Sequence, residues 1–138
     1  MNPTELVRLA KTAMQRAYVP YSGYKVGAAL LTKGGKVYLG CNIENAAFGP
    51  SNCAERTAFF TAIAAGETEF ESIAVVGGKD GVVTDIFPPC GVCRQVMQEF
   101  CAPDFMIYMG RGDDSYKAVP LEQLLPYGFN AAKYMSAK

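Results

Sequence analysis

Two short segments, Cys53-Ala54-Glu55 and Pro89-Cys90-Gly91-Val92-Cys93, constrain the fold of this chain more than any other feature. Cys90 comes thirty-five positions after Glu55, so the fold must bring distant segments together if the cysteines act as one group. Three protein ligands leave a tetrahedral zinc ion with an open position for water. A carboxylate two residues from a ligand lies within reach of that water. The two segments therefore predict a metal site at which Glu55 moves protons.

Length and charge limit the other possibilities. The 138 residues, 50% of them hydrophobic, can bury a full core, so we expect a single domain over residues 1–138. Thirteen Lys and Arg residues balance thirteen Asp and Glu residues, which argues against nucleic acid as the main partner. The sequence contains no long apolar run and no signal-peptide pattern at its start, so we expect a cytoplasmic protein without membrane contact.

Cysteine and histidine content narrows the chemistry. The chain has five cysteines, an odd number that argues against a complete disulfide framework and favours thiols or metal ligands. It has no histidine, which excludes Ser-His-Asp catalysis, Cys-His catalysis and any histidine-ligated metal. The soft ligands of a bound zinc ion would therefore be cysteines. We predict that the two remaining cysteines, Cys41 and Cys101, are small core residues.

Hydrophobic periodicity and turn residues predict alternating helices and strands. Asn2 is a candidate N-cap, because Pro3 follows it and Glu5 comes three residues later. The predicted helices cover residues 2–17, 53–65, 91–100 and 120–125, and the predicted strands cover 24–31, 36–41, 72–77, 105–109 and 116–119. This order implies an α/β fold with three layers, α/β/α, around a mixed sheet of about five strands.

Further details of the fold follow from short segments. Residues 110–115 are too few for a parallel crossover, so the strands on either side should form a hairpin. Cys53 and Cys90 should each lie near a helix N-terminus, where the helix dipole and free N–H groups favour a thiolate. The residues expected to face inward from the helix over 91–100 are Val92, Val96, Met97 and Phe100.

Each motif has an ordinary interpretation when it is taken singly. Cys90-x-x-Cys93 is also typical of a redox pair or of half a four-cysteine structural zinc site. An acidic residue such as Glu55 in a first helical turn commonly complements the helix dipole. The combination of C-A-E with P-C-x-x-C, however, matches the signature of zinc-dependent nucleobase deaminases, in which a glutamate that does not bind the metal acts as general acid and base. This is a match to a known pattern and not an independent derivation.

The chain resembles cytidine deaminases of the short, homotetrameric type. The resemblance spans nearly the whole chain in family order. The segments that carry it are Tyr21-Ser22-Gly23-Tyr24-Lys25-Val26-Gly27-Ala28-Ala29-Leu30, Gly40-Cys41-Asn42-Ile43-Glu44-Asn45-Ala46-Ala47, Asn52-Cys53-Ala54-Glu55-Arg56-Thr57-Ala58, Pro89-Cys90-Gly91-Val92-Cys93-Arg94-Gln95 and Glu122-Gln123-Leu124-Leu125-Pro126.

The resemblance implies one zinc ion per chain, with Glu55 as the proton shuttle. The implied ligands are Cys53, Cys90 and Cys93. Three thiolates give such a centre a net negative charge, which weakens the metal as a Lewis acid. We expect the Arg56 guanidinium to offset this charge by donating to the thiolate sulfurs, and Gln95 to add a neutral donor.

The resemblance also implies a nucleoside pocket. Asn42 and Glu44 would hold the ribose hydroxyls, and residues two apart on an extended segment point to one face, as this role requires. Tyr24, where a Phe is commoner in the family, and Phe48 and Ala54 would lie near the base or sugar. Phe129 corresponds to an aromatic residue that similar proteins donate to a neighbouring subunit, although packing in its own core is an equally good interpretation of its position.

The reaction implied by the resemblance is hydrolytic deamination of cytidine and deoxycytidine to uridine and deoxyuridine with release of ammonia, as in pyrimidine salvage. Glu55 would take a proton from water, deliver it to N3 of the ring and then protonate the leaving amine at C4. The site must favour the tetrahedral adduct over the planar ring.

Three other classes of protein share part of these features. A structural zinc or redox module would need a fourth ligand or a reactive dithiol. A deaminase of tRNA type would need a parallel crossover where residues 110–115 predict a hairpin. A deaminase of the nucleoside antibiotic blasticidin shares the zinc motif and the Leu-Leu-Pro ending, but the Asn42-x-Glu44 pair argues against it.

Overall fold

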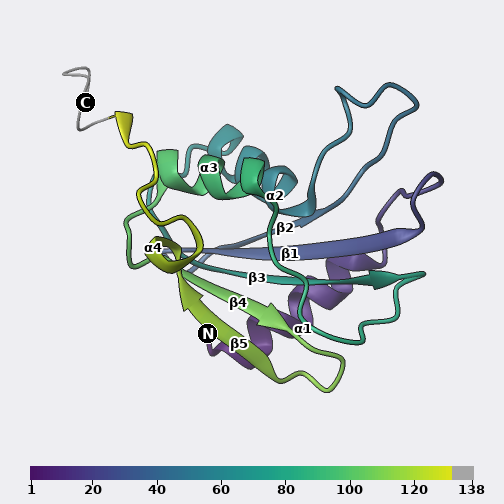
Figure 1. Ribbon diagram of the computed structural model, residues 1–138. Coiled ribbons are helices and arrows are strands. Elements are labelled where there is room, and N and C mark those ends of the chain that lie inside the picture. The colour runs from purple at the N-terminus through teal and green to yellow at the C-terminus, as the bar shows by residue number, and fades with distance from the viewer. Residues whose placement is uncertain (132–138) are drawn as a thin grey trace.

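The protein is a five-stranded mixed sheet with helices on both faces, as Figure 1 shows for the computed structural model, which describes residues 1–131. The α1 helix covers one face, and α2 and α3 cover the other. The prediction of a three-layer α/β/α fold is confirmed. In chain order the elements are α1 Pro3–Met14, β1 Tyr24–Thr32, β2 Val37–Cys41, α2 Ala54–Ala64, β3 Phe70–Lys79, α3 Gly91–Phe100, β4 Met106–Gly110, β5 Tyr116–Pro120 and α4 Leu121–Leu124.

The sheet has the strand order β2-β1-β3-β4-β5. The β1 strand pairs antiparallel with both β2 and β3, and β3 pairs parallel with β4, so α3 lies in the crossover between them. The β4 and β5 strands pair antiparallel, which confirms the hairpin predicted at residues 110–115. This pairing contradicts the parallel crossover that a tRNA-type deaminase would need there.

Side chains of the inner strands alternate between two apolar cores. Val26, Ala28 and Leu30 of β1 join the core under α2 and α3, where Phe59 and Met97 are fully buried. The alternate positions of β1, including Ala29 and Leu31, join a second core under α1, which supplies Leu6, Val7 and Ala10. Because strand side chains alternate with period two, one strand sequence serves both helix layers.

Two glycines set how closely the helices approach the sheet. A Cβ atom at Gly27 would overlap the Ala10 carbonyl oxygen of α1, and one at Gly40 would overlap the Ala54 carbonyl oxygen of α2. Neither position allows a side chain without a shift of the helix backbone. Gly40 therefore fixes the height of the first turn of α2, which is the turn that contains Glu55.

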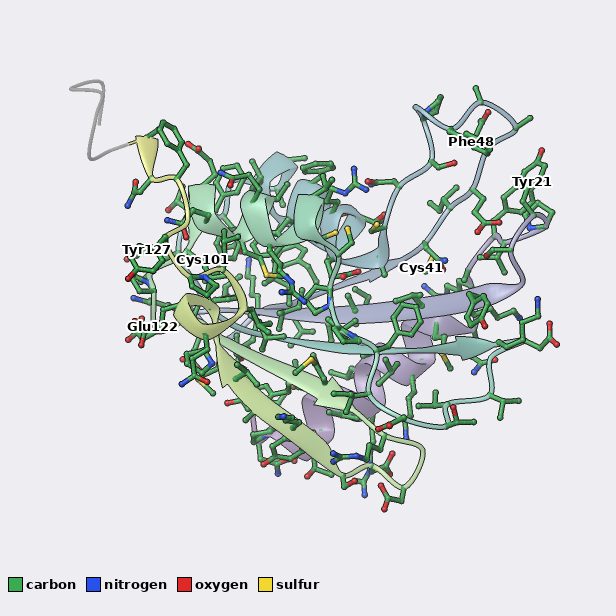
Figure 2. The ribbon with its side chains drawn as sticks, viewed as in Figure 1. Tyr21, Cys41, Phe48, Cys101, Glu122 and Tyr127 are labelled. Carbon is green, nitrogen blue, oxygen red and sulfur yellow. The ribbon has the colours of Figure 1, made fainter. Side chains whose placement is uncertain are left out.

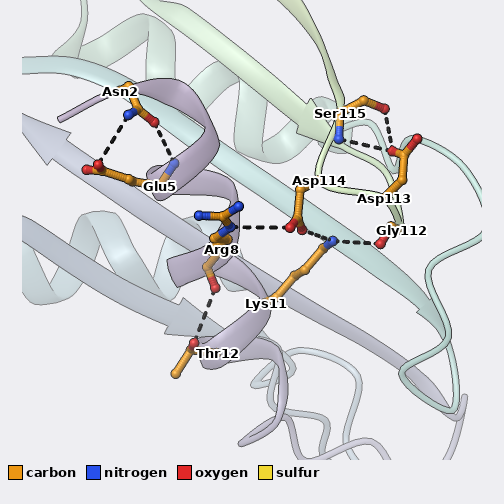
Figure 3. Close-up of polar contacts among 9 residues, drawn as sticks. All are labelled: Asn2, Glu5, Arg8, Lys11, Thr12, Gly112, Asp113, Asp114 and Ser115. Atoms are coloured by element: carbon orange, nitrogen blue, oxygen red, sulfur yellow. Dashed lines mark hydrogen bonds and ion pairs between the residues drawn. The ribbon is translucent and has the colours of Figure 1, made fainter.

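Polar contacts tie α1 to the β4–β5 hairpin, as Figure 3 shows. The predicted cap is confirmed, because the Asn2 side chain accepts a hydrogen bond from the Glu5 backbone N–H at 2.9 Å. Further along α1, the Arg8 and Lys11 side chains both donate to the Asp114 carboxylate in the hairpin turn, at 3.3 and 2.5 Å. These contacts lie on the α1 face of the sheet, remote from the cysteines.

Several predicted boundaries are wrong. The first helix ends at Met14 instead of continuing to residue 17, because the chain turns there to form an isolated bridge between Tyr18 and Ile43. The predicted strand over 72–77 extends over Phe70–Lys79, because Gly78 and Lys79 pair with β1. The polar tail expected after Phe129 falls mainly on residues 132–138, which lie outside the described residues.

The predicted inward face of α3 is also partly wrong. Met97 is buried and Val96 packs against the core, but Val92 and Phe100 are 57% and 40% exposed. The helix turns its Cys93–Met97 face inward instead, because these residues, four apart, lie one above the other on the same side. Within the described residues, no helix combines the length and apolar character needed to cross a membrane.

Candidate metal centre and substrate pocket

The three predicted metal ligands converge at the adjoining starts of α2 and α3. The Sγ atoms of Cys53 and Cys90 lie 3.7 Å apart, and those of Cys90 and Cys93 lie 3.5 Å apart. All three sulfur atoms lie within 4.8 Å of one another. A tetrahedral zinc ion with Zn–S bonds of about 2.3 Å separates its sulfur ligands by about 3.8 Å. The sulfur positions therefore fit a tetrahedral metal that has one position left for a ligand from solvent or substrate.

Local structure places these thiols where thiolates are stabilised. Cys53 is the N-cap residue of α2 and Cys90 is the N-cap residue of α3, and neither side chain makes a capping hydrogen bond. Cys93 follows in the first turn of α3 and is 1% exposed. The prediction that Cys53 and Cys90 lie near helix N-termini is confirmed. Both helix dipoles point their positive ends at the sulfur cluster and favour its negative charge.

Arg56 contacts the sulfur cluster as predicted. Its Nη2 atom donates to the Cys53 Sγ atom at 3.2 Å. Its Nε atom is buried and has no hydrogen-bond partner within residues 1–131. An orphaned donor beside thiols suits a centre whose sulfur atoms all become thiolates when a metal binds. Gln95 instead donates its side-chain amide to the Phe129 carbonyl oxygen at 3.5 Å, so its role as a donor to sulfur stays a prediction.

Hydrogen bonds between the cysteine side chains shift their pKa values in opposite directions. Hydrogen bonding with Cys93 and then with Arg56 lowers the pKa of Cys53 to about 5, against the opposing effect of burial. The same bond with Cys53, together with burial, raises the pKa of Cys93 above its ordinary value. Within the cluster, the hydrogen bonds favour the thiolate on Cys53 and the protonated thiol on Cys93. Since metal ligands must be thiolates, the remaining protons leave when a metal binds.

Glu55 is a buried carboxyl group in the first turn of α2, 4% exposed. Burial, with a smaller contribution from the nearby Cys53, raises its pKa to about 7 against the opposing effect of Arg56. A carboxyl group with a pKa near neutrality can both accept and donate a proton at the pH of the cell. Its position beside the sulfur cluster suits a group that moves protons.

A pocket of about 390 Å³ opens above this cluster. Most of the residues predicted to bind substrate line it together. The lining residues that were predicted are Tyr24, Asn42, Glu44, Phe48, Cys53, Ala54, Glu55, Arg56 and Cys90. Phe48 is 89% exposed on the loop after β2, and Figure 2 shows it beside Tyr21 at one end of the molecule. The wall of the pocket farthest from the core is thus built from exposed loop residues.

Asn42 and Glu44 both line the pocket, and hydrogen bonds with neighbouring backbone hold both side chains. The Asn42 side chain accepts from the Val26 N–H at 2.9 Å and donates to the Tyr24 carbonyl oxygen at 2.8 Å. Glu44 accepts from the backbone N–H groups of Tyr21 and Ser22 at 3.1 and 3.0 Å. Asn42 keeps one free N–H and both side chains keep acceptor capacity for a ligand.

Sequence reasoning missed part of the pocket wall. Phe87 lines the pocket, and its ring centroid lies 6.4 Å from that of Tyr24. It comes from the loop between β3 and α3, where an aromatic residue just before Pro88 and Pro89 was the available signal. Gly77 makes room for it, since a Cβ atom there would approach the Phe87 ring to 2.8 Å. The other lining residues that sequence reasoning missed are Val26, Ser51, Asn52 and Pro88.

Phe129 does not line this pocket and is 58% exposed. Packing in its own core, one of the two interpretations of this residue, is therefore wrong. Tyr127, which follows α4, lies at the opposite end of the molecule from Phe48, as Figure 2 shows. Cys101 packs at the edge of the core, where burial raises its pKa to about 12, whereas Cys41 is only half buried.

A mixed α/β sheet that places three convergent thiols and a buried carboxyl group below an open pocket defines a zinc-dependent deaminase. The family model of the cytidine and deoxycytidylate deaminase zinc-binding region matches residues 1–109. The chain belongs to this family.

Known proteins with the same fold share much of the sequence. The chain is 44% identical over 130 residues to a cytidine deaminase of Sporosarcina psychrophila, covering 94% of this chain and 93% of that one. It is 46% identical over 131 residues to a cytidine deaminase of Halalkalibacterium halodurans, covering 95% and 96%. A crystal structure of cytidine deaminase from Burkholderia pseudomallei superposes with a TM-score of 0.86 at 46% identity, covering 94% of this chain and all of that one.

Proposed function

We propose that the chain catalyses the zinc-dependent hydrolytic deamination of cytidine and deoxycytidine to uridine and deoxyuridine with release of ammonia. One observation carries this proposal: Glu55 and two of the three cysteines line the same pocket as Asn42 and Glu44. A proton-transfer group beside a metal site thus shares a cavity with polar groups suited to a sugar. The relatives named cytidine deaminase support the same substrate class.

The residues of this chain supply proton transfer and charge balance. A zinc ion held by the three cysteines would polarise a water molecule and lower its pKa toward about 7. Glu55 takes a proton from that water and passes it to N3 of the cytosine ring while the water oxygen bonds to C4. Glu55 then takes the remaining proton from the new C4 hydroxyl and delivers it to the amine as the C4–N bond breaks, so that the C4 oxygen becomes the carbonyl of the product and ammonia leaves. The helix N-termini and Arg56 offset the negative charge of the thiolates.

Recognition of the sugar belongs to the outer part of the pocket. Asn42 and Glu44 hold the ribose hydroxyls through the donor and acceptor capacity that their backbone contacts leave free. Tyr24, Phe48 and Ala54 contact the base or sugar. The Asn42–Glu44 pair also disfavours blasticidin as substrate. An open pocket above the cysteines disfavours a structural zinc module, which would need a fourth protein ligand there.

The assembly we propose is a homotetramer, in which Phe129 reaches the pocket of a neighbouring subunit. Its 58% exposure and its position outside the pocket of its own chain support this role. Exposed apolar residues on α2 and α3, including Phe60 and Val92, suit contacts between copies. Sedimentation that gives a fully active monomer would refute the tetramer. The free cysteines suit a reducing cytoplasm, where the reaction would serve pyrimidine salvage.

A comparison of substrates tests the proposed function. The loss of ultraviolet absorbance would be followed with cytidine, deoxycytidine, cytosine and blasticidin, alongside ammonia release and zinc content. We expect turnover of both nucleosides, little turnover of free cytosine, which lacks the sugar, and one zinc ion per chain. One zinc ion per chain without ammonia release would favour a structural module. A preference for blasticidin would reassign the substrate.

A further inference from the structure

Lys79, the last residue of β3, folds over the loop that holds Glu44. Its Nζ atom donates a hydrogen bond to the Ser22 carbonyl oxygen at 2.7 Å. The same ammonium group lies 5.3 Å from the centroid of the Tyr24 ring, within the range of a cation–π interaction. Lys79 does not line the substrate pocket, so it acts on the pocket only through the residues that it contacts.

Ser22 links Lys79 to Glu44. The backbone N–H of Ser22 donates to the Glu44 carboxylate at 3.0 Å, and the Ser22 hydroxyl donates to the other carboxylate oxygen at 2.5 Å. The Ser22 hydroxyl also accepts from the Tyr24 N–H at 3.0 Å. Ser22 therefore accepts a hydrogen bond from Lys79 on its carbonyl oxygen and donates two hydrogen bonds to the Glu44 carboxylate. The Lys79 charge also lowers the pKa of Glu44, after the larger effects of its hydrogen bonds with Ser22.

The backbone around this link is shaped to admit the lysine. Gly23 has a φ of +74°, and a Cβ atom there would approach the Lys79 Nζ atom to 2.7 Å. Asp80, the residue after Lys79, has a φ of 53° and donates its N–H to the Gly23 carbonyl oxygen at 2.7 Å. The end of β3 and the Ser22–Gly23 turn are thus joined by a backbone bond and a side-chain bond side by side.

We propose that Lys79 is a positioning residue for sugar recognition, which fixes Ser22 so that the Glu44 carboxylate faces the ribose hydroxyls. The inference rests on the proposed nucleoside deaminase activity and adds a residue that lies outside the pocket. Removing the lysine frees the Ser22 turn and disorders the Glu44 carboxylate, while the sulfur cluster and Glu55, at the starts of α2 and α3, stay in place. The effect therefore falls on the binding of substrates that carry ribose hydroxyls.

The test combines a substitution with a substrate that lacks the hydroxyls. With Lys79→Met we expect KM for cytidine to rise about three- to tenfold and kcat to stay within about twofold, as for loss of a hydrogen bond that acts only on binding. With 2′,3′-dideoxycytidine, the same substitution should leave KM unchanged, because this substrate has no ribose hydroxyl that could donate a hydrogen bond to Glu44. Lys79→Arg keeps a donor and a charge, and should restore KM for cytidine to within about twofold of the unmodified value.

Lys25→Met is the matched control. It removes one positive charge at the neighbouring strand position, which pairs with Gly78, and should leave both KM values unchanged. Equal rises in KM for cytidine and dideoxycytidine would show that Lys79 acts through the Tyr24 ring, and would overturn the inference. An unchanged KM for cytidine would overturn it as well, while the proposed function would stand. If the unmodified chain does not turn over cytidine, the proposed function and this inference both fail.

Discussion

One face of the sheet is covered by α1 alone, whereas the opposite face is covered by α2 and α3. Both faces bury an apolar core, and both bring a helix against a strand glycine, Gly27 under α1 and Gly40 under α2. They differ at the helix ends. The α1 helix begins with an ordinary Asn2 cap, whereas α2 and α3 begin at Cys53 and Cys90 with no side-chain cap.

This difference separates stability from chemistry. On the α1 face, the Asn2 side chain caps the start of the helix, so α1 contributes to the fold only through packing against the sheet. On the α2–α3 face, the helix starts keep their positive ends for thiolates and for the groups around them. Substitutions on the α1 face should therefore change stability alone, and those at the starts of α2 and α3 should change metal content or turnover.

The largest effect is expected for Cys93→Ser. Loss of a buried ligand at the start of α3 should reduce zinc from one ion per chain to nearly none and abolish turnover. Added zinc should then no longer raise the melting temperature, because a ligand stabilises a fold only through binding to it. Metal analysis and calorimetry measure these effects. Cys101→Ala, which changes a cysteine outside the cluster, is the control and should keep its zinc.

Glu55→Ala should keep its zinc and reduce kcat by about 10²–10⁴-fold, because it removes the proposed proton-transfer group but none of the three cysteines. Steady-state kinetics and metal analysis on the same sample measure both quantities. Glu71→Gln, which neutralises an exposed carboxylate on β3, should leave both unchanged. A loss of zinc in Glu55→Ala would show instead that Glu55 is a metal ligand.

Arg56→Ala should retain zinc in part and slow turnover by about 10- to 100-fold, as is typical for residues that orient metal ligands. Removing this positive charge raises the pKa of the groups that must be deprotonated for catalysis, so the acid limb of the pH–rate profile should move to higher pH. Arg56→Lys keeps the charge without the planar fork and should show a smaller shift. A pH–rate profile of Arg56→Ala that coincides with that of the unmodified enzyme would refute the proposed role of Arg56 in charge balance.

The metal site could be predicted from sequence because its chemistry is local. Cys53, Glu55, Cys90 and Cys93 occupy two short segments, and each segment also carries the signal for a helix start. The α3 helix was accordingly predicted with its observed bounds, Gly91–Phe100. Residue type and spacing suffice where the function needs a few particular atoms at the end of one element.

The outer wall of the pocket was harder to predict because it depends on how loops meet. The only local signal for Phe87 is its position just before Pro88 and Pro89, and Lys79 has none. Phe87 reaches the pocket through the β3–α3 loop, and Lys79 acts on it only through its contacts with Ser22 and Tyr24. The predicted strand ended at Gly77, so Gly78 fell outside it, whereas the observed strand continues to Lys79. A Cβ atom at Gly78 would overlap the Val82 carbonyl oxygen, so the strand keeps a glycine for close packing of the turn that follows.

The two glycines under the helices allow a direct comparison of the two faces. Gly27→Ala and Gly40→Ala should each destabilise the fold by about 1–3 kcal/mol, because the new methyl group overlaps helix backbone. Only Gly40→Ala should also lower zinc content and kcat, since it displaces the turn that carries Glu55. Gly49→Ala, where a Cβ atom meets open space, is the control for the substitution itself. Equal losses of kcat in both helix-facing variants would contradict the separation of the two faces.

The smallest effect is expected for Asp114→Asn, which weakens the contacts of the β4–β5 turn with Lys11 and Arg8 on the α1 face. Hydrogen bonding from Lys11 and then from Arg8 lowers the pKa of Asp114 below its ordinary value of 3.8. Since the folded-state pKa is the lower one, the carboxylate contributes stability above about pH 4, and this contribution is lost as the pH falls through the folded-state pKa.

Thermal melts of Asp114→Asn at pH 7 should therefore show a melting temperature only about 1–3 °C lower, because exposed ion pairs contribute little. The difference from the unmodified protein should shrink as the pH falls below about 4 and vanish below the folded-state pKa, where Asp114 is protonated and, like asparagine, uncharged. Added salt should reduce the difference as well, since it screens exposed charges. Asp114→Asn should change neither zinc content nor kcat at any pH, because the contacts of Asp114 with Lys11 and Arg8 lie on the α1 face of the sheet, away from the cysteines. A changed kcat would mean that the α1 layer also positions the catalytic groups.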